Sequence, residues 1–183
     1  MTHLGRGTAA VAAAISTLVA LGFSTPASAQ AACASAAAAV PQRGEIAAAR
    51  AATLCLINRE RRAHGLAPLK ADRRLTRAAT RYSRQMVRHG FFDHVGPGGS
   101  TMYQRVEAAG YTRWRTLGEN IAWGAGPLAS PARIVASWMR SPGHRRTILD
   151  ARLREVGVGI ARGAPQWNGD MPAATYTTDF GAR

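Results

Sequence analysis

The spacing of hydrophobic residues predicts two helices in the first half of the chain. From Glu45 to about His64 the sequence lacks Gly and Pro and is rich in Ala, Leu and Arg, which favours a helix. Between Asp72, a residue suited to an N-cap, and Gly90, apolar residues recur at helical spacing. These residues, which would form the buried face of the second helix, are Leu75, Ala78, Ala79, Tyr82 and Met86.

The segment GENIAWG has the alternation of a strand and follows a turn-rich loop at residues 91–100 and a short predicted helix at 102–109. Its apolar face holds Leu117, Ile121 and Trp123, and Glu119 falls on the same face. A carboxylate without a partner in an apolar setting is costly. The sequence therefore predicts that positive or hydrogen-bonding groups from elsewhere in the chain contact Glu119.

The second half of the chain combines helix starts with alternating strands. Ser130 and Ser141 each precede a proline, as N-cap residues of two successive helices do, and the first of these helices would bury Trp138. Alternation predicts two strands, around residues 156–160 and 174–180, and the Asn168-Gly169 pair between them favours antiparallel pairing. Because helices come first and strands largely later, we expect an α+β fold.

The first 29 residues have the features of a secretory signal peptide. Arg6 precedes a largely apolar run at residues 9–23, and Ala27-Ser28-Ala29 is a small-x-small cleavage site. No stretch is apolar over the length that a membrane span needs, so we expect no transmembrane segment in the mature chain. Residues 30–44 predict a flexible, alanine-rich leader. Residues 45–183 predict one domain, expected to be a monomer that is secreted or associated with the cell envelope.

The charge of the chain is strongly positive. It carries 24 basic and 10 acidic residues, a formal net charge of +14, and Lys70 is its only lysine. Such a balance favours anionic partners. For an exported protein these are an anionic cell-wall polymer or a lipid surface, and we expect no specific nucleic-acid partner. The alternative is that the arginines only form a solvated surface.

Cys33 and Cys55 are the only cysteines, in a chain that is expected to reach an oxidising compartment. We therefore expect them to form a disulfide. On the chain-entropy account, closing a loop of this length stabilises the fold by about 3 kcal/mol. Their spacing does not support a CxxC redox pair or a thiolate metal site.

Three ionisable residues lie where the predicted elements meet: His94 on the loop, Glu119 on the strand and His144 at a helix start. The positive end of a helix favours the neutral form of His144, which can bind metal or accept a proton. Two imidazoles and one carboxylate form a known zinc set with an open fourth position. Because no local motif joins the three residues, a hydrogen-bonded polar cluster is the alternative interpretation.

Five segments, in this order, resemble the bacterial branch of the CAP superfamily, which groups cysteine-rich secretory, antigen 5 and pathogenesis-related class 1 proteins. They are LCLINRERRAHGLAPL, LTRAATRYSRQMVRHGFFDH, GENIAWG, SWMRSPGHRRTIL and EVGVGIA, and the resemblance covers roughly residues 51–180. It implies an α-β-α sandwich, with a small antiparallel sheet between helical layers. It also implies a central cleft that contains His94, Glu119 and His144.

One position departs from the pattern of that superfamily. In many eukaryotic relatives a second glutamate stands three residues beyond the tryptophan that corresponds to Trp138, and here that position is Ser141. We expect Ser141 to line the cleft, but the tetrad of those relatives is incomplete. Asp93, Asp150 or Glu155 could supply the missing carboxylate.

Two functions are compatible with these residues. The preferred hypothesis is a binding module whose cleft takes a lipid, glycan or peptide, with His94, Glu119 and His144 anchoring a polar headgroup or a divalent cation such as zinc. The alternative is a metal-dependent hydrolase or protease in which the same residues activate water. Such an enzyme needs a proton-transfer group beside the metal, and Ser141 replaces the obvious carboxylate, so binding is favoured over catalysis.

Overall fold

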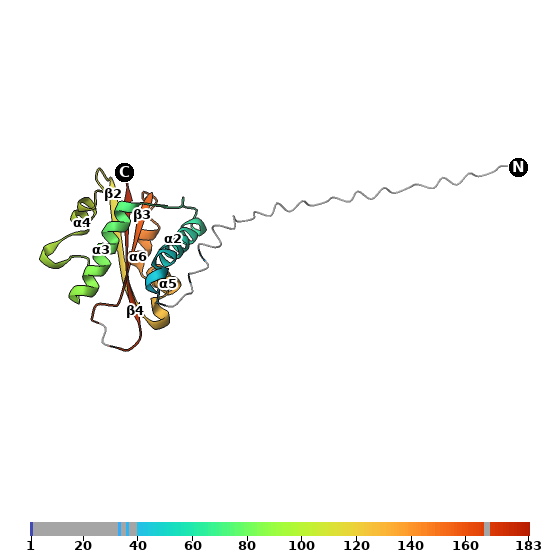
Figure 1. The fold of residues 1–183 in the computed structure, drawn as a ribbon. Coiled ribbons are helices and arrows are strands. Elements are labelled where there is room, and N and C mark those ends of the chain that lie inside the picture. The colour runs from blue at the N-terminus through green and yellow to red at the C-terminus, as the bar shows by residue number, and fades with distance from the viewer. Residues whose placement is uncertain (2–32, 34–35, 37–39, 167–168) are drawn as a thin grey trace.

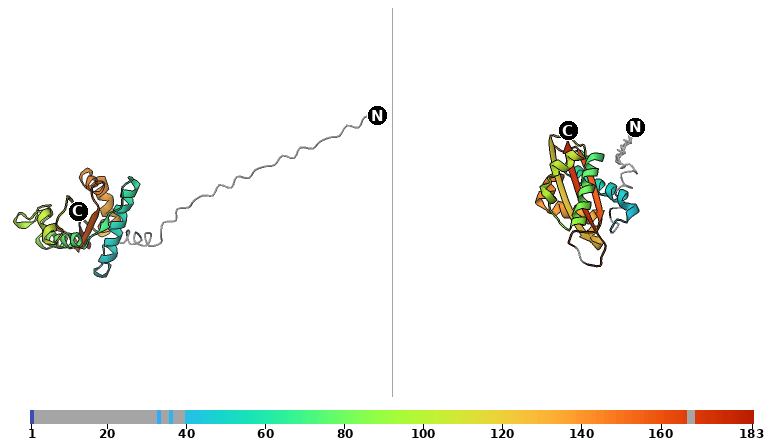
Figure 2. Two further views of the ribbon diagram at one scale, coloured as in Figure 1. Left: turned by 90° about the horizontal axis from the view of Figure 1, so that it is seen from above. Right: turned by 60° about the vertical axis from the view of Figure 1, so that its left-hand side comes forward.

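The computed structural model describes Met1, Cys33, Ala36, residues 40–166 and residues 169–183. Helices cover both faces of a central sheet, which confirms the predicted α+β sandwich (Figure 1 and Figure 2). The α-helices are α2 (Ile46–Ala63), α3 (Arg73–His89), α4 (Met102–Ala108), α5 (Pro131–Arg140) and α6 (Pro142–Ile148). The strands are β1 (Lys70–Ala71), β2 (Thr116–Ala125), β3 (Glu155–Arg162) and β4 (Ala173–Ala182). Short 3-10 helices are η2 (Arg43–Glu45), η3 (Pro97–Gly99) and η4 (Gly126–Ala129).

The strands lie in the order β1-β3-β4-β2, so β4 is central. It pairs antiparallel with both β3 and β2, and the pairing of β3 with β4 confirms the antiparallel pair predicted from the Asn168-Gly169 sequence. The residue Asn168 of the predicted turn lies outside the described residues. A two-residue strand, β1, pairs parallel with β3, so the sheet is not purely antiparallel. Two residues are too short to show alternation, which is why the sequence did not indicate this strand.

Helix ends follow the capping residues in most places. The Asp72 carboxylate accepts hydrogen bonds from two backbone N–H groups of α3, and Gly90 ends that helix in the left-handed conformation. Ser130 caps α5 as predicted, by accepting from the backbone N–H of Arg133. Ser141 occupies the N-cap position of α6, but its side chain makes no capping hydrogen bond.

Two glycines of β3 allow α3 to lie directly on the sheet. A Cβ atom placed on Gly157 would stand 2.0 Å from the backbone of Leu75, and one on Gly159 would stand 2.1 Å from the backbone of Ala79. No side chain fits at either position unless the helix moves away. Figure 1 shows α3 running along the strands on this face, while α2, α5 and α6 lie on the other.

The core on the second face is built around Trp138 of α5. Its side chain is fully buried and packs in one cluster with Ile134, Val135 and Tyr176. The indole N–H donates to the backbone oxygen of Ile121 at 3.1 Å, which fixes α5 against β2. The predicted core position of Trp138 is therefore confirmed.

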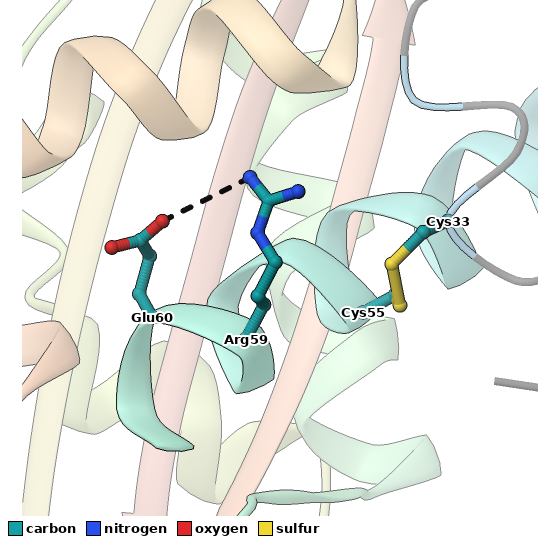
Figure 3. The surroundings of a disulfide bond; sticks show 4 residues. All are labelled: Cys33, Cys55, Arg59 and Glu60. Atoms are coloured by element: carbon teal, nitrogen blue, oxygen red, sulfur yellow. Dashed lines mark ion pairs between the residues drawn. A yellow bond between two sulfur atoms is a disulfide. The ribbon is translucent and has the colours of Figure 1, made fainter. Parts of the chain in front are cut away.

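The predicted disulfide between Cys33 and Cys55 is present, with Cα atoms 5.5 Å apart. Figure 3 shows the bond joining the segment that contains Cys33 to α2, one turn before the ion pair of Arg59 with Glu60.

Ala36 and Val40, from the predicted leader, are buried in the main core cluster. Apart from Met1, the predicted signal peptide lies outside the described residues, so the division of the chain at residues 29 and 44 stays a prediction. Within the described part, no helix is both long and apolar enough to cross a membrane.

Truncation of the core tryptophan tests this packing. We expect Trp138→Ala to lower the free energy of unfolding by about 3–5 kcal/mol, because a large cavity replaces a buried indole. Trp138→Phe keeps most of the packing but leaves the Ile121 oxygen without its donor, so it should cost about 1–3 kcal/mol. Urea unfolding followed by circular dichroism measures both, with the exposed Leu128→Ala as control. An unchanged midpoint for Trp138→Ala would contradict the assignment.

Candidate functional site

The Glu119 carboxylate lies on β2 and is bound by two positive groups from other segments. Its side chain is only 3% exposed. Oε1 accepts from Nδ1 of His94 at 2.8 Å, and Oε2 accepts from Nη2 of Arg105 at 2.7 Å. The expected partner His94 is thus found, whereas Arg105 was not foreseen. Charge-assisted bonds of this kind offset the cost of burying a carboxylate.

Arg105 joins Glu119 to the loop before α4. Its guanidinium also donates to the backbone oxygens of Ser100 at 2.7 Å and His94 at 3.1 Å. On its other side it stacks 3.4 Å from the ring centroid of Tyr82, a buried residue of α3. One side chain therefore sets the position of the carboxylate and of the loop that carries His94. Nothing in the sequence signalled this role, because an arginine in a very short helix looks exposed.

A second carboxyl group, Asp179 of β4, lies directly opposite Glu119 in the sheet register. It is 1% exposed, and its Oδ1 atom has no hydrogen-bond partner among the described residues. Burial and the adjacent Glu119 charge raise the pKa of Asp179 well above its usual range. The pair of adjacent carboxyl groups thus favours the protonated form of Asp179 more than an ordinary aspartate would. Asp179 belongs to the polar residues that alternate with apolar ones along β4, a pattern that predicts an exposed face. The sequence therefore did not indicate its burial, because β4 is covered on both faces.

The Glu119 contact changes the protonation of His94. The hydrogen bond to Glu119, opposed by partial burial, raises the pKa of the His94 imidazole above its ordinary value of 6.5. Nδ1 of the ring is used by Glu119, and no other hydrogen bond of the ring is present in the described part of the chain. The half-exposed imidazole can therefore offer a positive charge and its Nε2 N–H to solvent or a ligand.

His144 reaches β2 from the other face of the sheet. The side chain of Asn120, which points away from Glu119, donates to the backbone oxygen of His144 at 3.1 Å. Burial, and secondly the charge of His94, lower the pKa of the His144 imidazole below 6.5. This direction agrees with the neutral form expected for His144, although the main cause is burial. Among the described residues, no hydrogen bond joins the His144 ring to Glu119 or to His94.

Within the described residues, no hydrogen bond or ion pair joins Glu119 to the residues considered as replacements for the missing glutamate, although one of them, Asp93, is the chain neighbour of His94. Asp93 accepts from the backbone N–H of Val95, Asp150 pairs with Arg152, and Glu155 pairs with Arg183. The acid that lies beside Glu119 is Asp179 instead. Ser141 sits at the junction of α5 and α6, and within the described part of the chain no hydrogen bond joins it to the Glu119 cluster.

The arrangement does not form the three-ligand set expected for zinc. Among the described residues, no group of three His, Cys, Asp or Glu side chains is placed to hold a metal ion. Both Glu119 oxygens already accept from a positive partner, so a cation would compete with the Arg105 guanidinium. Zinc binding at His94, Glu119 and His144 stays a prediction.

A pocket of about 310 Å³ opens beside the pair of His94 and Glu119. Its other lining residues are Val95, Thr101, Met102 and Tyr103. Val95 and Tyr103 are about half exposed, at 51% and 49%, and form an apolar rim. The pocket therefore combines apolar walls with one ionisable imidazole, and its volume is at the lower end of small-molecule sites.

Solved structures share this fold. A Bacillus anthracis extracellular protein containing an SCP domain superposes with a TM-score of 0.64 at 23% identity, over 78% of this chain and 44% of that one. An outer surface protein from Borrelia burgdorferi gives a TM-score of 0.57 at 21% identity, over 71% of this chain and 89% of that one. The class of fold is thus that of SCP domains, with helices on both sides of a small sheet.

Sequence comparison gives the family. The profile described as "CAP: Cysteine-rich secretory protein family" matches residues 54–179, and the chain belongs to this family. The uncharacterized Bacillus subtilis protein YkwD is 35% identical over 112 residues, which are 61% of this chain and 42% of that protein. The uncharacterized B. subtilis membrane protein YlbC is 34% identical over 60% of this chain and 30% of its own length. The chain spans less than half the length of either relative.

The pKa of His94 tests the contact with Glu119. We expect NMR titration of the His94 ring to give a pKa above 6.5 in the wild type and a lower one in Glu119→Gln. Because the folded pKa is raised, the pair stabilises the fold fully below about pH 6.5 and loses this effect as pH rises through the folded pKa. The difference in unfolding free energy between wild type and His94→Gln should shrink over that interval. Equal His94 pKa values in both proteins would contradict the contact.

The raised pKa of Asp179 predicts that the substitution Asp179→Asn is tolerated. Asp179→Asn has the shape of the protonated acid, so its free energy of unfolding at neutral pH should equal or exceed that of the wild type. Because the pKa of Asp179 is higher in the folded protein, the wild type should lose stability as pH rises from the unfolded-state pKa, near 3.8, towards the folded-state pKa. The Asp179→Asn variant should not show this loss. Urea unfolding at about pH 5 and 7.5 measures it. The exposed Asp170→Asn is the control, and strong destabilisation of Asp179→Asn alone would show an ionised, paired Asp179.

Proposed function

We propose that this chain is a secreted CAP domain that binds a small amphiphilic ligand with an anionic head in the pocket beside His94. The observation that carries the proposal is the pairing of His94 with the buried Glu119 at an apolar pocket. Glu119 orients the ring through Nδ1 and favours its protonated form. The ring then presents a positive charge to an anionic group.

The pocket walls favour an apolar body for the ligand. Val95, Met102 and Tyr103 offer aliphatic, thioether and aromatic surface, and Thr101 adds one hydroxyl group. A glycan would need several polar partners, so among the expected ligand classes a lipid-like carboxylate or phosphate fits best. A disulfide in the described chain supports an oxidising compartment.

Binding is supported over hydrolysis by the state of Glu119. Each oxygen of this carboxylate already accepts a charge-assisted hydrogen bond, from His94 or from Arg105, so proton abstraction by Glu119 would have to compete with these two bonds. The cluster therefore supports a role in holding His94 and the loop rather than in activating water.

Calorimetric titration with octanoate, an eight-carbon carboxylate, tests the proposal. We expect binding at about pH 6 that weakens as His94 loses its proton at higher pH. His94→Gln should weaken binding by about tenfold, as loss of one charge-assisted contact does. His89→Gln, a histidine exposed on α3, should leave it unchanged.

Other outcomes separate the alternatives. Absence of octanoate binding, or equal effects of the two histidine variants, would contradict the proposed pocket. Zinc binding that is lost in both His94→Gln and His144→Gln would support the metal site instead.

A further inference from the structure

A second cavity, of about 620 Å³, lies along the β3 edge of the sheet, two strands away from the β2 strand that carries Glu119. It is formed where α2 and α3 meet beside the outer part of β3, and the strand order places β4 between this site and β2. β1 pairs only with Glu155 and Val156, so the cavity stands beyond the end of that short strand. Its polar lining consists of five arginines: Arg43, Arg50, Arg84, Arg88 and Arg162. Its floor is apolar and consists of Ile46, Val87, Ile160 and Ala161.

These arginines have no acidic counterpart. No Asp or Glu of the described chain lines the cavity, and within that same part none of the five makes an ion pair. Elsewhere the protein does pair its arginines: Arg105 binds Glu119, Arg152 binds Asp150, and Arg183 binds Glu155. The cavity thus gathers positive charge without a counterion, unlike those sites.

Arg50 is the most constrained member of the cluster. Its Nη2 donates to Thr80 at 2.9 Å, which links α2 to α3, while its Nε is buried and has no hydrogen-bond partner among the described residues. Burial and the charge of Arg84 lower the pKa of the Arg50 guanidinium. Guanidinium groups nevertheless stay charged in proteins, so the fold holds like charges together at a cost. A bound anion would offset that cost.

We propose that this arginine cavity binds an oligophosphate, a ligand with two or more phosphate groups close together. The forked guanidinium matches phosphate oxygens in pairs, and several arginines around one cavity can bind adjacent phosphates. The apolar floor lowers the local dielectric and strengthens these contacts. A hollow between two helices suits a discrete ligand better than the flat surface of a membrane.

This site is independent of the pocket beside His94, and it gives a location to the anionic partner that the net charge alone could only suggest. The arginines that would bind the ligand come from η2, α2, α3 and the end of β3. Variants of the cavity should therefore leave octanoate binding at His94 unchanged.

Titration calorimetry with sodium tripolyphosphate at low ionic strength tests the proposal on the disulfide-bonded protein. The cavity variant Arg50→Gln with Arg84→Gln removes one arginine from α2 and one from α3. The matched control, Arg59→Gln with Arg81→Gln, removes the same charge from the same helices, at exposed positions that do not line the cavity. We expect the cavity variant to bind at least about tenfold more weakly and the control to stay within about twofold.

A second cavity variant guards against a loss of folding. The variant Arg84→Gln with Arg88→Gln keeps the bond of Arg50 to Thr80 and changes only exposed side chains, so it should fold. We expect it to bind tripolyphosphate more weakly than the wild type does. Absence of tripolyphosphate binding, or equal weakening in cavity and control variants, would overturn the proposal.

Sedimentation with vesicles of phosphatidylglycerol and phosphatidylcholine tests whether the partner is a membrane surface instead of a free oligophosphate. If vesicles bind through the cavity arginines and tripolyphosphate does not, the partner is a lipid surface and the oligophosphate site is wrong.

Discussion

The close approach of α3 to β3 is the constraint on which the rest of the structure depends. It requires the absence of side chains at Gly157 and Gly159, because helix backbone occupies the space where Cβ atoms would be. From this position α3 places the Tyr82 ring beneath Arg105. Arg105 can then bind Glu119 and the loop of His94 together. The geometry of the pocket therefore depends on the two glycines of β3 on which α3 packs.

The same helix also separates two kinds of electrostatic environment. Towards β2, buried charge is compensated: Glu119 has Arg105 and His94, and the pKa of the adjacent Asp179 carboxyl is raised by burial and by the Glu119 charge. Towards the outer edge of β3, positive charge collects around an apolar floor without any acid among the described residues that line it. Compensated charge stabilises one conformation, whereas uncompensated charge raises the free energy of the unliganded state. The two regions therefore differ in electrostatic balance, which is neutralised by ion pairs in one and left positive in the other.

Sequence patterns were sufficient for most of the fold. Asp72, Gly90 and Ser130 mark helix ends by local chemistry, and the alternation in β3 and β4 is visible without tertiary information. The partners of Glu119 were harder, because they depend on which segments meet in space. His94 could be proposed from its place on a loop and from family resemblance. Arg105 and Asp179 could not be, since an arginine in a short helix and an aspartate in an alternating strand both look exposed in the sequence.

The carboxylate in GENIAWG is held by two positive side chains, His94 and Arg105, from other segments of the chain. Replacing the whole polar cluster by apolar side chains would often be neutral or stabilising in a protein core. What such a replacement could not reproduce is the set of bonds from Arg105 to the backbone oxygens of Ser100 and His94, which hold one wall of the pocket. Glu119 keeps Arg105 in that position and at the same time favours the protonated form of His94. Its burial is therefore best understood as the means by which the sheet controls both the shape and the charge of the pocket.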